Sequence, residues 1–269
     1  MARIDFFLTL KMSLFSCPTI ETQTDRIKLS DPCLISDLHL NTEVSAHAAF
    51  FSRFLNEVAD KHKELVILGD FFDYWVGDDA WESAAAILEP LKQWAKKHSL
   101  YIMHGNRDFM MGKSLTERLG ATLLADPTVA EISNRKILLS HGDIWCINDQ
   151  DYQKVRRKVR SFWWQWMVLR LPLTKRLDIA HNARARSKVS KVNKDAFLMD
   201  VDNPTIKNEC QRLGCDLVIH GHTHRPGSYL IDEKLSRFVL PDWDFRASNA
   251  YRGGYLTFSD TKPELLTFS

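Results

Sequence analysis

Five short groups of Asp, His and Asn residues could perform metal-dependent chemistry, and each directly follows a short apolar run. The groups read DLH (37–39), GDFFD (69–73), GNRD (105–108), HGD (141–143) and HGHTH (220–224). Neutral imidazole is the commonest metal ligand, and Asp and Asn add oxygen ligands, a mixture that suits Mn²⁺, Fe or Zn²⁺. The candidate ligands are Asp37, His39, Asp70, Asn106, His141, His222 and His224.

The number of candidate ligands indicates two metal ions. Seven side chains are too many for one tetrahedral ion, but they suit two ions that share a carboxylate. Two ions about 3.5–4 Å apart are a standard device for splitting phosphate esters. Solvated polar loops with surface histidines would explain one such group, whereas five groups at equivalent places require a common cause.

The elements that must position these residues are strands alternating with helices. Apolar runs at 32–36, 64–68, 100–103, 136–140 and 216–219 predict strands, and apolar spacing at i, i+3 and i+4 predicts helices at 46–62 and 82–98. Such alternation favours an α/β fold, and α/β sheets bind ligands at the carboxyl ends of their strands. Every polar group lies at such an end.

Composition is typical of a globular protein with a substantial core. The chain has 269 residues, 45% hydrophobic and 26% charged, which suits one large α/β domain or a domain with an insertion. A net charge of +2 gives no overall nucleic-acid signal. Five cysteines without zinc-site spacing favour a reducing compartment. Residues 1–30 do not fit a signal peptide, and we expect a poorly ordered extension there.

The five groups, in this order, resemble the calcineurin-like metallophosphoesterases over about residues 33–226. The resemblance implies an αββα sandwich, within a domain spanning residues 31–269. It also implies which residues hold each metal ion. Asp37, His39, Asp70 and His224 would hold one ion, and Asp70, Asn106, His141 and His222 the other, with Asp70 shared.

The sequences of several blocks are similar to those of a narrower family, the pyrophosphohydrolases that act on UDP-2,3-diacylglucosamine in lipid A biosynthesis. The blocks are GDFFDYWVGDD, GNRDFMMGK, HGHTHRP and VLPDWD. This resemblance implies hydrolysis of a lipid-linked UDP-sugar at the α-phosphate, giving UMP and 2,3-diacylglucosamine 1-phosphate, with two Mn²⁺ ions. It implies a cytoplasmic protein, peripheral on the inner membrane.

Arg107 stands where many phosphomonoesterases of this group carry His. Arginine cannot act as an acid, but it can hold two phosphate oxygens at once. A phosphate leaving group needs little protonation, so Arg107 indicates a pyrophosphate substrate. The alternative is that Arg107 only pairs with a carboxylate such as Asp108. We expect Asn106, Arg107 and His222 to stabilise phosphoryl charge, and Asp108 to orient a histidine ligand.

An inserted segment, residues 151–195, is called the lid here. It holds thirteen Lys and Arg against three Asp, together with the run SFWWQWMVLRLPL (161–173). We expect helix up to Pro172 and again over about 174–190. A helical hairpin with a solvated basic face would explain this composition, as would a surface for acyl chains and an anionic membrane, or one for nucleic acid.

The resemblance favours the lipid interpretation, with no nucleic acid and no obligate protein partner. It implies substrate contacts at Asp149, Tyr152, Arg184, Ser187 and Lys194. Lys191 stands where the family pattern has Asn, and it remains a candidate for binding a phosphate or a sugar hydroxyl. A nuclease or nucleotide pyrophosphatase on the same scaffold is the rival activity. A non-catalytic scaffold would have lost ligands, whereas all seven are present.

Overall fold

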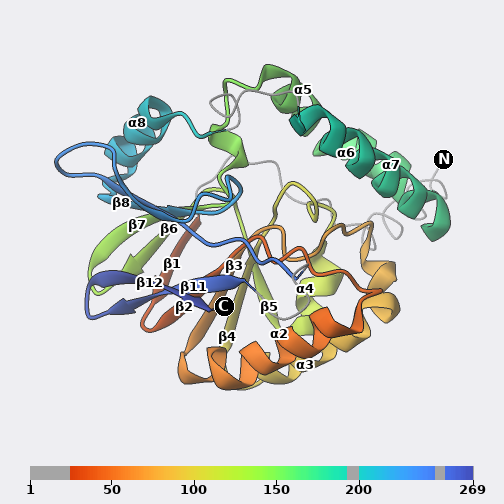
Figure 1. Cartoon of the computed structure of the whole chain (residues 1–269), viewed down its shortest axis with the longest axis horizontal. Helices are drawn as coiled ribbons and strands as arrows, with labels where there is room; N and C mark the ends of the chain where they lie inside the picture. Colours follow the sequence, from red (N-terminus) through yellow and green to blue (C-terminus); the bar gives the residue numbers. More distant parts are fainter. Residues whose placement is uncertain (1–24, 193–199, 246–251, 269) are drawn as a thin grey trace, which may run out of the picture.

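The computed structural model describes residues 25–192, 200–245 and 252–268, and its strands form two six-stranded sheets (Figure 1). The first sheet has the order β1-β6-β7-β8-β10-β9. Its strands are Asp25–Leu29 (β1), Thr128–Ile132 (β6), Arg135–Ser140 (β7), Leu217–His220 (β8), Gly227–Leu230 (β9) and Ser236–Val239 (β10). The second has the order β12-β11-β2-β3-β4-β5. Its strands are Pro32–Ile35 (β2), Glu64–Leu68 (β3), Ser99–Met103 (β4), Ala121–Leu124 (β5), Gly253–Ser259 (β11) and Lys262–Phe268 (β12).

The two sheets pack face to face and helices cover their outer faces, so the predicted αββα sandwich is confirmed. Buried Val66 and Leu68 of β3 meet Ile137 and Leu139 of β7 in the core between the sheets. Burying such side chains supplies most of the driving force for folding. The outer face of the second sheet is covered by Ser45–Glu57 (α2), Ala85–Ala95 (α3) and Lys113–Leu119 (α4). The outer face of the first is covered by Asn203–Leu213 (α8).

The structure confirms the predicted strands and helices, with shifted ends. The first predicted helix ends at Glu57 and is followed by a 3-10 turn at Ala59–Lys61. The second begins only at Ala85, after a 3-10 helix at Asp78–Ala84. At the amino end of the chain, residues 25–29 form β1 rather than part of an extension, since they pair in parallel with β6. Residues 1–24 lie outside the described residues.

The lid, as far as the structure describes it, contains three helices rather than the two expected. They are Gln150–Val159 (α5), Phe162–Leu169 (α6) and Leu173–Val192 (α7), and in Figure 1 they lie beyond the carboxyl ends of the central strands. Buried arginines attach the lid to the sandwich. Arg156 Nε lies 2.8 Å from Asp143 Oδ2, and Arg176 is paired with Asp79. No helix in the described ranges has the length and apolar character needed to span a membrane.

Candidate metal centre

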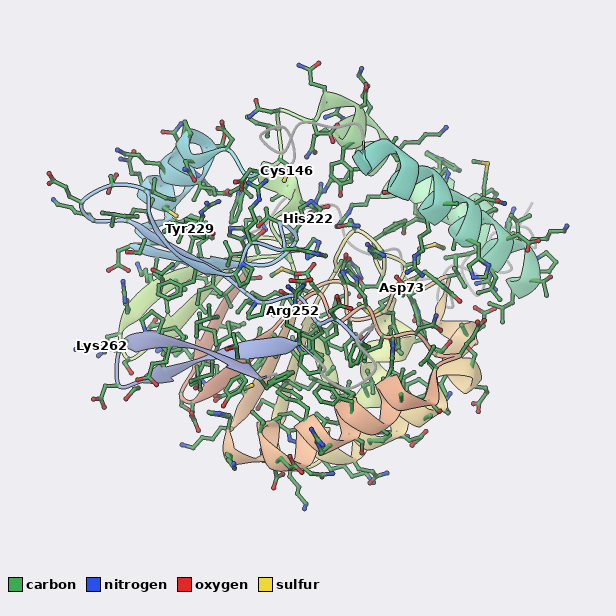
Figure 2. The ribbon with its side chains drawn as sticks, in the orientation of Figure 1. Asp73, Cys146, His222, Tyr229, Arg252 and Lys262 are labelled. Carbon is green, nitrogen blue, oxygen red and sulfur yellow. The ribbon has the colours of Figure 1, made fainter. Side chains whose placement is uncertain are left out.

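The seven predicted ligands all lie in loops that leave the carboxyl ends of central strands. Strands β2, β3 and β4 are parallel neighbours in one sheet, and β7 and β8 are parallel neighbours in the other. Parallel neighbours end at the same edge of a sheet, so the loops from both sheets meet between them. Figure 2 shows His222 at this edge of the sandwich, on the side that faces the lid.

The loops turn sharply because several ligands adopt left-handed backbone conformations. Positive φ angles between 48° and 65° occur at Asp37, His39, Asp70, His222 and His224. Such angles are uncommon for residues other than glycine, and they concentrate at functional sites. The sharp turns aim side chains from different strands at one place.

One group of possible ligands consists of Asp37, His39 and His224. His224 Nε2 lies 3.3 Å from Asp37 Oδ1 and 3.3 Å from His39 Nε2. His39 Nε2 lies 4.0 Å from the same Asp37 oxygen. Three donor atoms from two sheets therefore face one point.

A second group consists of Asp37, Asp70 and His141, with Asn106 beside it. His141 Nε2 lies 3.8 Å from Asp70 Oδ1 and 3.1 Å from Asn106 Oδ1. The other oxygen of Asp70 lies 3.8 Å from His39 Nδ1, so this carboxylate lies between the two groups. The rings of His222 and His141 lie 5.0 Å apart.

Burial and hydrogen bonding fit this donor set to divalent cations. Asp37 and Asp70 are almost fully buried close together, and burying two carboxylates is costly unless positive charge compensates. Asp37 Oδ1 and His39 Nδ1 are buried without a hydrogen-bond partner among the described residues. Buried polar atoms normally have partners, so an unsatisfied carboxylate oxygen among buried carboxylates and imidazoles is what a cation site requires.

The pKa shifts reflect the same crowding of charge. Burial, assisted by the charge of Arg107, holds the pKa of His39 well below its usual value, which keeps the imidazole neutral and able to bind a metal. Burial raises the pKa of Asp70. Burial lowers the pKa of His141, but the charges of Asp70 and Asp37 outweigh it and raise that pKa to about 9. Both carboxylates therefore attract positive charge to this point.

Asp108 does not orient a histidine ligand, and that expectation is wrong. Its Oδ1 accepts a hydrogen bond from Gly105 N and its Oδ2 one from Phe71 N, both at 2.7 Å. Asp108 thus joins the loops that follow β3 and β4. Burial and the charge of Asp70 raise its pKa to about 7.

Two other groups orient the histidines. The His224 Nδ1 atom lies 3.5 Å from Asp242 Oδ2, and His141 Nδ1 lies 2.9 Å from the carbonyl oxygen of Leu68. A partner on one ring nitrogen leaves the other to a metal. Asp242 lies in the VLPDWD block, and the sequence offers no local signal for its partner.

Arg107 has carboxylate partners, although Asp108 is not among them. Its Nη1 donates to Asp73 Oδ1 at 2.8 Å, and its Nε lies 3.4 Å from Asp70 Oδ2. Its backbone N–H donates to the other Asp70 oxygen at 2.9 Å. The guanidinium thus lies directly beside the candidate metal ligands.

The predicted substrate contacts have different places in the structure. Asp149 caps α5 by accepting from Tyr152 N at 3.1 Å. The Tyr152 hydroxyl donates to Asp143 Oδ2 at 2.6 Å, and its ring lies 5.9 Å from that of His222. Arg184 on α7 is paired with Asp73.

The remaining predicted contacts lie toward the end of the lid. Ser187 is exposed on α7. Lys194 and the side chain of Lys191 lie outside the described residues. The sequence reasoning missed Arg160, whose Nη2 donates to Gly105 O at 3.0 Å and lies 3.5 Å from Asp143. It thereby connects the lid to the loop that carries Asn106.

Comparison with known proteins gave matches to a family model, to characterised relatives and to solved structures. The family model for calcineurin-like phosphoesterase matches residues 33–226. The UDP-2,3-diacylglucosamine hydrolase of Aeromonas salmonicida is 41% identical over 78% of this chain and 84% of its own length. The enzyme of that name from Bordetella parapertussis is 37% identical over 86% of this chain and 93% of its own. A dimetal phosphatase from Danio rerio is 13% identical, with a TM-score of 0.48 over 90% of this chain and 99% of that one.

The matched range contains all five residue groups that converge at the metal centre, and the relatives match over most of their length. The chain therefore belongs to the calcineurin-like phosphoesterases and, within them, to the family of the UDP-2,3-diacylglucosamine hydrolases.

Proposed function

We propose that this protein hydrolyses the pyrophosphate bond of UDP-2,3-diacylglucosamine at the α-phosphate, giving UMP and 2,3-diacylglucosamine 1-phosphate. The observation that carries the proposal is a buried Asp and His donor set with Arg107 at its side, beneath an aromatic and basic lid. The name borne by relatives about 40% identical supports the substrate.

Two divalent ions, which we assign as Mn²⁺, fit the seven ligands Asp37, His39, Asp70, Asn106, His141, His222 and His224. When bound, such ions supply Lewis acidity and lower the pKa of water. A water oxygen forms the new bond to the α-phosphorus, and the bond from that phosphorus to the bridging oxygen breaks. The water oxygen therefore ends in UMP.

The side chains of Asn106, Arg107 and His222 stabilise the negative charge that develops on the phosphoryl oxygens. Arg107 cannot donate a proton, which suits a leaving group that is itself a phosphate. The sugar 1-phosphate leaves with the bridging oxygen and needs no strong acid. A pyrophosphate substrate thus fits the residue at this position better than an alkyl phosphate monoester does.

The lid is proposed to bind the acyl chains and the head group, with Asp149, Tyr152, Arg184, Ser187, Lys191 and Lys194 as contacts. Trp164 and Val168 of α6 pack against the core of the sandwich. Trp163 and Met167, on the same helix, are 68% and 56% exposed. The lid therefore offers apolar surface on two sides, one toward the core and one toward the surroundings.

The exposed side of the lid suits a membrane surface. Phe162 and Leu171 are exposed beside Trp163 and Met167, and the lid carries ten more basic than acidic residues. Aromatic and aliphatic side chains with lysines and arginines around them are typical of surfaces that bind anionic bilayers. We therefore propose a peripheral position on the cytoplasmic face of the inner membrane, where the lipid substrate would lie.

The decisive experiment is a product assay in water enriched in heavy oxygen. Metal-stripped protein is incubated with UDP-2,3-diacylglucosamine, with and without Mn²⁺. Labelled UMP that appears only with metal would establish the substrate, the metal dependence and attack at the α-phosphorus together. If no UMP forms but another pyrophosphate or phosphodiester is cleaved, the proposed metal centre stands and the proposed lipid substrate is wrong.

A further inference from the structure

Asp73, the last residue of the GDFFD block, has arginine partners from both the sandwich and the lid. Its Oδ1 accepts from Arg107 Nη1 at 2.8 Å, and its Oδ2 is paired with Nη1 of Arg184 on α7. The Asp73 side chain is 4% exposed, and the Arg184 side chain is 49% exposed. Figure 2 shows Asp73 on the side of the sandwich that faces the lid helices. One buried carboxylate thus joins an arginine of the core to an arginine of the lid.

The geometry of the guanidinium groups leaves this cluster able to bind an anion. A guanidinium has five N–H donors in a fixed plane. Arg107 uses Nη1 for Asp73, and its Nε lies beside Asp70, so among the contacts of the described residues its Nη2 can still donate to a phosphate. The two arginines use different Asp73 oxygens, so neither displaces the other.

We propose that Asp73 is a positioning residue, which aligns Arg107 and Arg184 as one phosphate-binding pair and so couples the lid to the metal centre. The inference rests on the proposed function, since the phosphate concerned is that of the departing sugar 1-phosphate. It assigns to Asp73 a role in substrate affinity that a purely structural carboxylate would not have.

Asp79 provides a matched control, because it also pairs with a lid arginine. Arg176 Nη1 donates to Asp79 Oδ1 at 2.8 Å and to the carbonyl oxygen of Val76. Neither Asp79 nor Arg176 contacts Arg107 or a candidate metal ligand in the contacts of the described residues. Asp79→Asn should loosen the lid while leaving the phosphate-binding pair in place.

The test compares Asp73→Asn, Asp73→Glu, Arg184→Gln, Asp79→Asn and the double variant Asp73→Asn/Arg184→Gln, each loaded with Mn²⁺. Asparagine keeps one acceptor oxygen and turns N–H donors toward the second arginine. Steady-state kinetics with UDP-2,3-diacylglucosamine give KM and kcat. Hydrogen exchange of the α7 amides reports lid attachment without using activity.

We expect Asp73→Asn to raise KM by about tenfold to a hundredfold, since it unpairs a charge-assisted hydrogen bond, with kcat little changed. The amides of α7 should exchange faster. Asp73→Glu should change KM and exchange less than Asp73→Asn does. The double variant should change KM and exchange no more than the single variant with the larger effect. Asp79→Asn should quicken exchange to a similar degree but raise KM much less than Asp73→Asn does.

The proposal would be overturned if the effects of Asp73→Asn and Arg184→Gln on KM and on α7 exchange were additive. It would also be overturned if Asp73→Asn changed neither KM nor α7 exchange. Because Arg184 is half-exposed, its variant is expected to fold even if Asp73→Asn does not, and unchanged KM and exchange in Arg184→Gln would likewise overturn it. If the wild-type protein does not cleave the lipid, the proposed function fails. The non-additivity of α7 exchange then still decides whether Asp73 couples the lid to the centre.

Discussion

His39 and His224 bring their Nε2 atoms to 3.3 Å from one another, although the two residues are 185 positions apart in the chain. Asp37 Oδ1 lies 3.3 Å from the same His224 nitrogen. Two imidazole nitrogens facing each other must either share a proton or direct their lone pairs at a cation. The neighbouring buried carboxylates favour the cation.

Removing Asp70, which lies between the two groups, or His141 of the second group should abolish turnover. We expect Asp70→Ala and His141→Ala to lower kcat/KM by at least about a thousandfold, because metal ions contribute several kcal/mol to catalysis. Turnover and bound metal, measured by elemental analysis, give the result. Far-UV circular dichroism serves as the control for folding, and substantial activity in either variant would contradict a two-metal centre.

Asp242 should affect the centre through His224 rather than by direct ligation. Asp242→Asn removes the charge that faces His224 Nδ1 at 3.5 Å. Loss of such an orienting partner typically weakens metal binding by about 10–100-fold. Calorimetric titration of the metal-stripped protein with Mn²⁺ measures the affinity. Asp232→Asn, at an ion pair with Lys207, is the control and should bind as the wild type does. Equal Mn²⁺ affinities in Asp242→Asn and Asp232→Asn would show that Asp242 does not support the metal centre.

Asp108 should matter for stability as well as for activity. Its buried carboxylate accepts from Gly105 N and Phe71 N, so Asp108→Asn forces N–H donors against one of these backbone amides. We expect the free energy of unfolding to fall by about 2–3 kcal/mol, the cost of losing a buried charge-assisted hydrogen bond. Urea titration of the metal-stripped protein measures this without any contribution from bound ions. Asp60→Asn, at an exposed pair with His98, is the control. A loss no larger than that of the control would show that Asp108 does not hold the loops together.

The exposed side of α6 should determine membrane binding. Trp163→Ser with Met167→Ser removes apolar side chains that are 68% and 56% exposed. Each large side chain is worth about 1.5–3 kcal/mol when fully buried, so binding to vesicles of anionic phospholipid should weaken at least tenfold. Vesicle sedimentation measures it, and hydrolysis of a soluble phosphodiester should not change. Leu230→Ser, on β9 and 72% exposed, is the matched control. Equal losses in the two proteins would reject a specific membrane surface on the lid.

The sequence by itself determined the α/β class and the set of residues that converge. Apolar runs end at Asp37, Asp70, Asn106, His141 and His222, and the carboxyl ends of parallel neighbours must share an edge. Because this follows from local pattern and simple topology, it required no knowledge of side-chain packing. The family resemblance added the sandwich and the grouping of ligands.

Only the tertiary structure decided which partners these residues have. Asp108 lies two residues from Asn106 but accepts hydrogen bonds from backbone amides, whereas Asp242, 18 residues after His224, faces that histidine. Asp73 joins Arg107 to Arg184 in the same way across the fold. Such pairings depend on the distances between loops, which are set by the packing of the two sheets and the lid helices. That spacing results from close packing of side chains throughout the core, which no local sequence pattern contains.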